Sequence, residues 1–479
     1  MMHVRGQFLA TFLATFLATF LAAALAACAA PQRAADEARG TVRREVDERL
    51  GMPQQDEVGM VAEERVRELC AGGLDEDEAV RVTLLSNRAL TARYAELGVS
   101  AAELEQTRLW ANPVLEVGLL FFGDGTQIDL GLSQSFVDVF LRPRRAAVAE
   151  HELDGARARV ARDVVGHVFA TRRAHVTVLA ARARFELESR HAAALEASVE
   201  LVRRLHVAGN VTATDVALEE AALAARLLTR SAAELAFVAA RESLSREMGV
   251  WGDLLAFEIT GELRLDAASG LDLERVESRA VTASLDLAEG RSHMHALAQA
   301  VGVAELDARL PEAQIGLMAE KDHGESDWGL GPHAAIGIPL GDAGSTRGFG
   351  ARARLAAAEA MYWSRAVEIR SRARTLRERL RALAGDARFA RDVLVPAEQQ
   401  VVLETLRNYN AMQVGVFDVL RAQGAELAAE RRAVTLAAKA AQARLDLEEL
   451  LAGSANGARA DFDGQETNEA GPDTARGGH

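Results

Sequence analysis

Two stretches of the chain, "RLHVAGNVTATDVALEEA" at residues 204–221 and "RNYNAMQVGVFDVLRAQG" at residues 407–424, decide the fold. Each begins with an arginine, carries an Asp-Val pair eleven residues later and interrupts a long alanine-rich run with a short turn. The two arginines are 203 residues apart, and so are the two aspartates. Matching turns at so large a spacing predict an internal duplication in which long helices turn back on themselves.

Composition supports long helices and excludes one class of partner. Only 5% of the 479 residues are aromatic, while alanine, leucine, arginine and glutamate are abundant, which favours helix. The net charge of -15 argues against a nucleic-acid partner, because binding phosphates requires a basic face. Lysine occurs only at Lys321 and Lys439, so arginine carries nearly all the positive charge. We interpret this as a compositional bias that indicates no binding site.

The first residues have the pattern of a bacterial lipoprotein signal. An apolar run, "FLATFLATFLATFLAAALAA", ends in "LAAC", so that small residues directly precede Cys28. We expect residues 1–27 to be a cleaved signal peptide and Cys28 to become the first residue of the mature protein, carrying acyl chains such as palmitate. The run is also just long enough to span a bilayer, so an uncleaved anchor helix is the alternative.

Residues 28–73 are polar and charged, with scattered glycine and proline, and we expect an N-terminal tether that holds one short helix at most. The second cysteine, Cys70, lies in this segment. It has no partner within the chain once Cys28 is acylated, so disulfides do not hold this fold. We expect Cys70 to be a small packed residue.

Residues 74–250 form the first predicted repeat. Asp75, with Glu78 three residues later, has the pattern of a capping box and starts a helix that ends near Trp110, before Pro113. The hydrophobic period then changes from helical to alternating, which predicts two strands. The predicted elements of this repeat are a helix over 75–110, strands at about 113–136, a long helix over 144–207 and a returning helix over 211–249.

Each predicted strand of this repeat has one apolar face. The apolar positions are Leu115, Val117, Leu119, Phe121, Ile128, Leu130, Leu132 and Phe136, whereas Glu116, Asp129 and Ser133 lie on the opposite face. Strands of about ten residues have the length of transmembrane β-strands. A soluble, half-buried hairpin shows the same alternation and stays open as an alternative.

Residues 273–452 repeat this order after a linker at 251–272. The predicted elements are a helix over 273–308, strands at about 312–340, a long helix over 347–410 and a last helix over 416–452; residues 453–479 predict a disordered tail. Placed end to end, helices 211–249 and 273–308 match the length of one long helix, as do 416–452 and 75–110. We therefore expect a stacked pair of short helices beside each long one.

No motif for catalysis or cofactor binding is present. The sequence lacks "HExxH", "CxxC", "GxSxG" and "GxxxxGK[ST]", and the glycine-rich "GDAGSTRGFG" lacks the lysine of a phosphate loop. His293 and His295 are two residues apart, so on a helix they cannot face one metal ion. We expect no enzyme activity, no cofactor and no metal site.

The order of elements resembles the TolC-like outer membrane factors of bacterial efflux systems. The stretches "LDEDEAVRVTLLSNRAL", "TRLWANPVLEVGL", "LHVAGNVTATDVALEEAAL" and "YNAMQVGVFDVLRAQ", and Pro396 in "VLVPAEQQ", carry the resemblance over about residues 74–452. It implies a mainly α fold with a β-barrel portion, in which three chains form one tunnel. Each chain then gives four strands to the barrel, which lies in the outer membrane, and its helices to a periplasmic cylinder.

The same resemblance implies partners and contact residues. The channel would give passive exit to substrates delivered by an inner-membrane pump, expected to be proton-driven, and a periplasmic adaptor. The adaptor would contact the helical turns at Ala208, Gly209, Asn210, Val211 and Thr212 and at Gln413, Val414, Gly415 and Val416. Arg204, Asp215, Arg407 and Asp418 flank these turns, and we expect them to help close the entrance, within one protomer or between protomers.

Two other classes of protein stay open at this point. A periplasmic adaptor also combines a coiled-coil hairpin with a lipid anchor, but it carries one hairpin inserted in soluble β-domains. A structural coiled-coil lipoprotein would have no reason to keep two amphipathic strand pairs. The alternation of strands and long helices, repeated twice, favours the channel.

Overall fold

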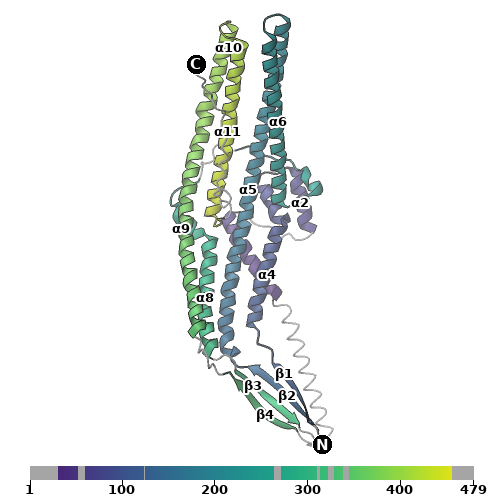
Figure 1. Cartoon of the computed structure of the whole chain (residues 1–479), viewed down its shortest axis with the longest axis vertical. Helices are drawn as coiled ribbons and strands as arrows, with labels where there is room; N and C mark the ends of the chain where they lie inside the picture. Colours follow the sequence, from purple (N-terminus) through teal and green to yellow (C-terminus); the bar gives the residue numbers. More distant parts are fainter. Residues whose placement is uncertain are drawn as a thin grey trace, which may run out of the picture.

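The computed structural model describes residues 31–51, 60–122, 125–263, 271–309, 313–321, 328–337 and 345–455. These residues form a long helical body with a small sheet at one end and two helical turns at the other (Figure 1). Cys28, the expected signal peptide and most of the expected tail lie outside the described residues.

Four strands form one antiparallel sheet in the order β1-β2-β3-β4. They are β1 (Val114–Phe122), β2 (Gly125–Ser135), β3 (Ala313–Lys321) and β4 (Gly329–Ile336). The two repeats join where β2 pairs with β3, with Leu132 opposite Leu317. The expected class, mainly α with two strand pairs, is therefore confirmed. The outer edges of β1 and β4 have no partner strand within the described chain.

The first repeat contains α3 (Glu76–Ser86), α4 (Arg88–Arg108), α5 (Asp138–Val207) and α6 (Ala213–Met248). The capping box at Asp75 is formed as expected, and the Glu78 amide donates to Asp75 Oδ1 at 2.8 Å. The single helix expected over 75–110 is divided at Asn87, whose side chain accepts from the Ala89 amide and so caps α4. The long helix begins at Asp138, six residues earlier than expected.

The second repeat contains α7 (Val276–Ala283), α8 (Leu285–Arg309), α9 (Ser345–Phe389), α10 (Val395–Asn410) and α11 (Val416–Leu451). The long helix expected over 347–410 is interrupted by a π-helix, η2 (Ala390–Leu394). Pro396 explains the interruption, because its ring would clash with the Asp392 carbonyl in a regular α-helix. The Val395 amide instead donates to the Ala390 carbonyl.

Short helices do stack end to end, but the expected pairs are wrong: helix 211–249 stacks on the first helix of its own repeat, and helix 416–452 on the first helix of the second repeat. Ser86 Oγ donates to the Met248 carbonyl at 2.5 Å and Asn87 Nδ2 to the Glu247 carbonyl at 2.7 Å, so α4 continues α6. The Leu285 amide donates to the Gly453 carbonyl at 3.0 Å, so α8 continues α11. The lengths of the four helices are too similar for length alone to have distinguished the two combinations.

The expected tether at 28–73 is largely helical and packed. A helix spans residues 31–50, and its Ala38, Val42 and Val46 are fully buried against α4 and α5. Arg49 Nη1 donates to the carbonyls of Ala283 at 2.6 Å and Ala452 at 3.1 Å, where α7 and α11 end. The charged residues that suggested a tether form the solvent face of an amphipathic helix.

A second packed helix, α2 (Met60–Gly72), carries Cys70 into a core cluster with residues of α3, α5 and α6 and of the short 3-10 helix η1 (Gly252–Ala256). Burial raises the pKa of the Cys70 thiol above its ordinary value. This environment is that of a packed, unreactive residue.

Both helical turns reverse the chain through one residue with positive φ. In the first turn this residue is Gly209, at φ 78°, and Thr212 and Asp215 then form a capping box that starts α6. In the second turn Met412 takes this conformation, at φ 58°, whereas Gly415 is extended and caps α11. Met412 is thus the residue equivalent to Gly209 at the 203-residue spacing, and Gly415 does not reverse the chain.

The tightest backbone approach in the sheet is at Gly316, and it gives a first prediction. A Cβ atom there would collide with the Leu132 carbonyl oxygen and lie 2.9 Å from Ser133 Cα. We expect Gly316→Ala to destabilise the fold by about 1–3 kcal/mol, as overpacking does. Gly331→Ala, on the same face with open space around it, is the control. Thermal unfolding in detergent, followed by circular dichroism, measures both; equal midpoints would contradict the expectation.

The capping box of α6 gives a second prediction. Hydrogen bonds from the Thr212 hydroxyl and amide lower the pKa of Asp215. Because folding lowers the pKa of Asp215, the stabilisation that its ionised carboxylate gives to α6 is fully present above the unfolded-state pKa, about 4. It is lost as the pH falls through the lower folded-state pKa. Asp215→Ala should speed amide exchange in the first turn of α6 several-fold at pH 7, while Thr214→Ala should not. Unchanged exchange in Asp215→Ala would refute the cap.

Candidate functional site

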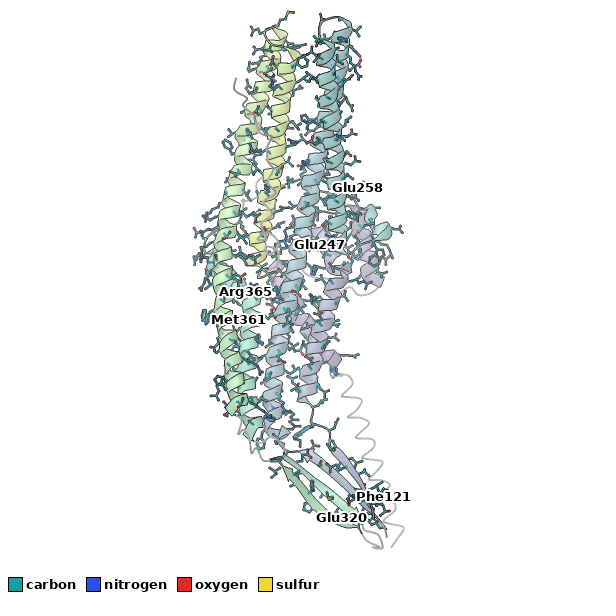
Figure 2. The ribbon with its side chains drawn as sticks, viewed as in Figure 1. Phe121, Glu247, Glu258, Glu320, Met361 and Arg365 are labelled. Carbon is teal, nitrogen blue, oxygen red and sulfur yellow. The ribbon has the colours of Figure 1, made fainter. Side chains whose placement is uncertain are left out.

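The two faces of the sheet differ in polarity. Val117 lies opposite Leu130, and Leu130 lies opposite Ala319, so the apolar positions of neighbouring strands share one face. Large apolar side chains on this face are exposed, up to 79% for Phe121 (Figure 2). The exposed members are Leu115, Val117, Leu119, Phe121, Leu130, Leu132, Ile315, Leu317, Leu330 and Ile336. A contiguous apolar surface of this kind needs a cover of lipid or protein.

The opposite face carries acidic groups and glycines, together with exposed Val114 and Leu120. Glu116 and Asp129 each lie opposite a glycine of the neighbouring strand, so small residues leave room for the carboxylates. Asp129 also lies opposite Glu320, and the Gln127 side chain donates to both carboxylates. Ser133 was expected on this face and lies there, but its side chain is buried and in contact with Gln314.

Where the sheet meets the helical body, aromatic and basic side chains gather on the surface. Trp110 is 55% exposed, and the Arg142 guanidinium stacks on its ring with Cζ 4.0 Å from the centroid. Phe136 and Phe140 are also exposed and meet edge to face. Nothing in the sequence marks Arg142, because its contact with Trp110 spans the whole β1–β2 hairpin.

The predicted contact residues at the two turns are at the surface, at the end of the molecule farthest from the sheet (Figure 1). Ala208, Gly209, Asn210, Thr212, Gln413 and Gly415 are exposed, and Val211, Val414 and Val416 are half-buried. Two hairpins, α5–α6 and α10–α11, therefore present one turn each at the same end of the body.

The four residues expected to close the entrance do not pair with one another within the described chain. Arg204 Nε contacts Glu200 Oε1 at 2.9 Å, and Arg407 Nη1 contacts Glu404 Oε1 at 2.6 Å, each along its own helix. The aspartates cap helices instead: Asp215 accepts from Thr212, and Asp418 accepts from the Gly415 amide at 3.1 Å. An Asp in the first helical turn finds backbone amides closer than an arginine on the facing helix.

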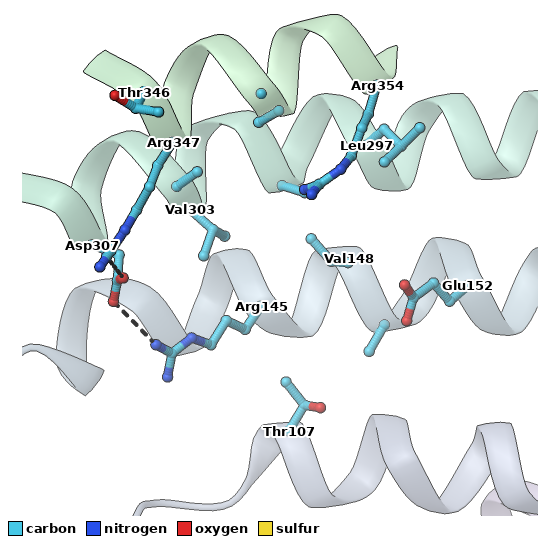
Figure 3. Close-up of a pocket in the computed structure, with 15 residues that line it drawn as sticks. Thr107, Arg145, Val148, Glu152, Leu297, Val303, Asp307, Thr346, Arg347 and Arg354 are labelled. Carbon is cyan, nitrogen blue, oxygen red and sulfur yellow. Dashed lines mark hydrogen bonds and ion pairs between the residues drawn. The ribbon is translucent and has the colours of Figure 1, made fainter. Parts of the chain in front are cut away.

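A hollow of about 670 Å³ lies on the helical body next to the sheet and is lined by α4, α5, α8 and α9 (Figure 3). Asp307 lies between two arginines, 3.6 Å from Arg145 Nη2 and 3.2 Å from Arg347 Nη1. Apolar residues such as Val148 and Leu297 form its floor. Its lining contains no histidine, cysteine or serine.

Within the described ranges, no helix combines the length and apolarity needed to cross a membrane. The same residues contain no group of three or more histidine, cysteine, aspartate or glutamate side chains that could hold a metal ion. His295 instead lies against His151, with ring centroids 5.3 Å apart.

Comparison with known proteins gives a likeness in structure alone. No protein-family profile matches the sequence. No curated protein matches it either.

Three solved structures show what the fold resembles. The outer membrane protein VceC of Vibrio cholerae superposes with a TM-score of 0.66 at 17% identity, over 79% of this chain and 96% of VceC. The MtrE outer membrane channel of Neisseria gonorrhoeae, in its open state, superposes with a TM-score of 0.64 at 15% identity, over 82% of this chain and 89% of MtrE. The CmeC outer membrane channel of Campylobacter jejuni superposes with a TM-score of 0.63 at 13% identity, over 81% of this chain and 87% of CmeC. The chain therefore has the TolC-like fold that these outer membrane channels share.

Proposed function

We propose that the protein is the outer membrane channel of a tripartite efflux system, and that three copies form one tunnel. The observation that carries this proposal is the sheet, which has one exposed apolar face, one face that carries acidic groups, and two edges without a partner strand in the described chain. Such a sheet suits a barrel wall between lipid and a water-filled lumen. The likeness to solved outer membrane channels supports the same assignment.

The number of strands requires more than one chain. Backbone groups at open sheet edges cannot remain unpaired in hydrocarbon, so β1 of one copy has to pair with β4 of another. Four strands per chain and three chains give a twelve-stranded barrel. Apolar residues on α6 (Leu228 and Leu235) and α9 (Met361 and Trp363) are 65–75% exposed and would be covered by the neighbouring copies.

The membrane boundary would lie at the junction of sheet and helices. Aromatic side chains favour the interface between lipid and water, and Trp110, Phe136 and Phe140 are exposed there. The Arg142 guanidinium on the Trp110 ring adds a positive charge at the level of the lipid phosphates. At the far end of the sheet, Lys321 lies 5.9 Å from the Trp328 ring centroid and marks the outer boundary.

A lipid anchor at Cys28 fits this placement. The helix over 31–50 begins three residues after Cys28. Its start is directed towards the sheet, because Ala35 lies beside Gly98 while Arg43 lies over the ring of Tyr94. The helix thus runs antiparallel to α4, whose last residues lead into β1. Acyl chains on Cys28 would enter the same leaflet that the junction contacts.

The two turns would form the periplasmic end, where the adaptor binds and the inner-membrane pump delivers substrates. We assign the adaptor contacts to the exposed turn residues. Since Arg204, Asp215, Arg407 and Asp418 form no mutual pairs within the chain, any role in closing the entrance has to come from contacts between copies. We assign the protein no catalytic activity and no cofactor.

The alternatives are less consistent with the sheet. In water, a periplasmic adaptor or a structural lipoprotein would need another part of its chain to cover the apolar face. No described helix packs on that face. A direct test is solubility after removal of the signal and Cys28. The channel should still require detergent, whereas an adaptor or structural lipoprotein should be soluble without it.

Adjacent residues on opposite faces of β1 give a sharper prediction. Val117→Arg would place a charge against lipid and should cost about 2–4 kcal/mol, whereas Glu116→Arg, facing the lumen, should cost about 0–1 kcal/mol. The yield of oligomer that resists dissociation in mild detergent measures the difference. Equal losses for the two variants would show that the assigned faces are wrong.

The lipid anchor gives a separate prediction. Intact-mass measurement of protein purified from membranes should find a chain that begins at Cys28 and carries acyl groups. Cys28→Ser should lack this mass increase, and its signal segment should remain attached. An unmodified Cys28 in the wild-type protein would refute the anchor, and the barrel assignment would be unaffected.

A further inference from the structure

The hollow on the helical body is lined by a row of four helices. Neighbouring helices of this row pack against one another in the order α4, α5, α8 and α9, which is also the order of the strands that adjoin them. Because all four helices line one hollow, the row curves around it and the hollow lies on the concave side (Figure 3). In a ring of three copies, the concave side of each row faces the axis. The opening of the hollow to a tunnel therefore rests on the proposed function.

At the end of the hollow nearest the sheet, charged side chains balance one another. Arg145 Nη1 lies 3.3 Å from Asp138 Oδ1, and its Nη2 lies 3.6 Å from Asp307 Oδ1. Arg347 Nη1 lies 3.2 Å from the other oxygen of Asp307. Two guanidinium groups thus face two carboxylates, and these four groups together carry no net charge.

Farther from the sheet, two opposite charges lie on either side of the hollow. Arg354 extends from α9 and Glu152 from α5, both side chains are exposed, and Figure 3 shows no ion pair between them. Axes of packed helices are about 8–10 Å apart, so α5 and α9, which flank α8, are about 15–20 Å apart. Val148 and Leu297 belong to the apolar floor of this part of the hollow. One cation and one anion are therefore separated by an apolar surface.

We propose that this hollow binds small amphipathic zwitterions, with an anionic group at one end, a cationic group at the other and an apolar segment between them. The Arg354 guanidinium pairs with the anionic end and the Glu152 carboxylate with the cationic end. The apolar segment covers Val148 and Leu297 and is removed from water. The volume of about 670 Å³ suits such a molecule, because sites for small organic ligands measure about 300–1,000 Å³.

The test measures binding of 8-aminooctanoic acid to the purified full-length oligomer by equilibrium dialysis, with binding to detergent micelles alone subtracted. Octanoate and octylammonium, which carry one charge each, are compared with it. Arg354→Gln should weaken binding of 8-aminooctanoic acid and octanoate about five-fold, as expected for an exposed ion pair, and leave octylammonium unchanged. Glu152→Gln should weaken 8-aminooctanoic acid and octylammonium and leave octanoate unchanged.

Arg352→Gln and Glu150→Gln are the matched controls. Both residues are exposed, lie two positions from Arg354 and Glu152 on the same helices, and are not part of the lining of the hollow. Neither control should change the affinity for any of the three probes. No binding of 8-aminooctanoic acid by the wild-type protein, losses that do not follow the charge of the probe, or equal losses in the controls would overturn the proposal.

A further variant fills the hollow without changing its charges. Gly350 belongs to the lining, and a Cβ atom there would meet no other atom within 4 Å. Leucine also favours helix over glycine, so Gly350→Leu should fold, and thermal unfolding verifies this. Its side chain should abolish binding of all three probes. Wild-type affinity in Gly350→Leu would show that the probes bind elsewhere and would contradict the assignment.

A competition experiment separates this class of solute from a lipid headgroup. Glycerophosphoethanolamine carries a phosphate and an ammonium group close together, with no apolar segment between them, so it should not displace 8-aminooctanoic acid. Displacement would assign the hollow to a headgroup and refute the proposed ligand class. All these measurements are made without conduction or transport. Failure of binding therefore leaves the channel assignment standing, and a protein that does not conduct can still bind the probe.

Discussion

The unpaired edges of the four-stranded sheet are the constraint on which the rest of the structure depends. A sheet with β1 and β4 open and one face covered in exposed leucine, valine and isoleucine is stable neither in water nor, alone, in hydrocarbon. Water would leave the apolar face uncovered, and lipid would leave the backbone groups of both edges without partners. Closing the barrel with further copies of the chain satisfies both demands at once.

The proposed closure would also arrange the helical body. Each strand pair leads into a long helix, so an assembly that closes the strands into a ring would place the helices in a ring as well. Shorter helices pack along both long ones. The helices α6 and α4 lie beside α5, whereas α11 and α8 lie beside α9 (Figure 1). The helix at 31–50 connects α7 and α11, because Arg49 donates hydrogen bonds to carbonyl groups at the ends of both helices.

Local patterns in the sequence predicted most of the elements. Strict alternation identified the strands, and Asp75 with Glu78 marked a helix start, since both signals depend on residues close together in the chain. Thr171 and His175, on α5, are polar residues buried among apolar neighbours. Both find partners in α3 and the segment before it: Thr171 hydrogen-bonds Thr83, and His175 lies 3.4 Å from the Leu74 carbonyl.

The errors arose where the outcome depends on distant residues or on competition between partners. Helices of nearly equal length gave no way to tell that α4 continues α6, which depends on the side chains of Ser86 and Asn87. Arg204 and Asp215 were expected to attract one another, but each has a nearer partner on its own helix. Glu188 on α5 forms ion pairs with Arg226 on α6 and Arg431 on α11, and no short stretch of sequence reveals this cluster.

The central claim is that copies of this chain close into one water-filled channel, and single-channel recording in planar lipid bilayers tests it most directly. Purified oligomer should insert in uniform steps of conductance, with a preference for cations expected from the acidic face of the sheet around Asp129 and Glu320. Protein that inserts without conducting, or that shows no uniform step size, would contradict the account.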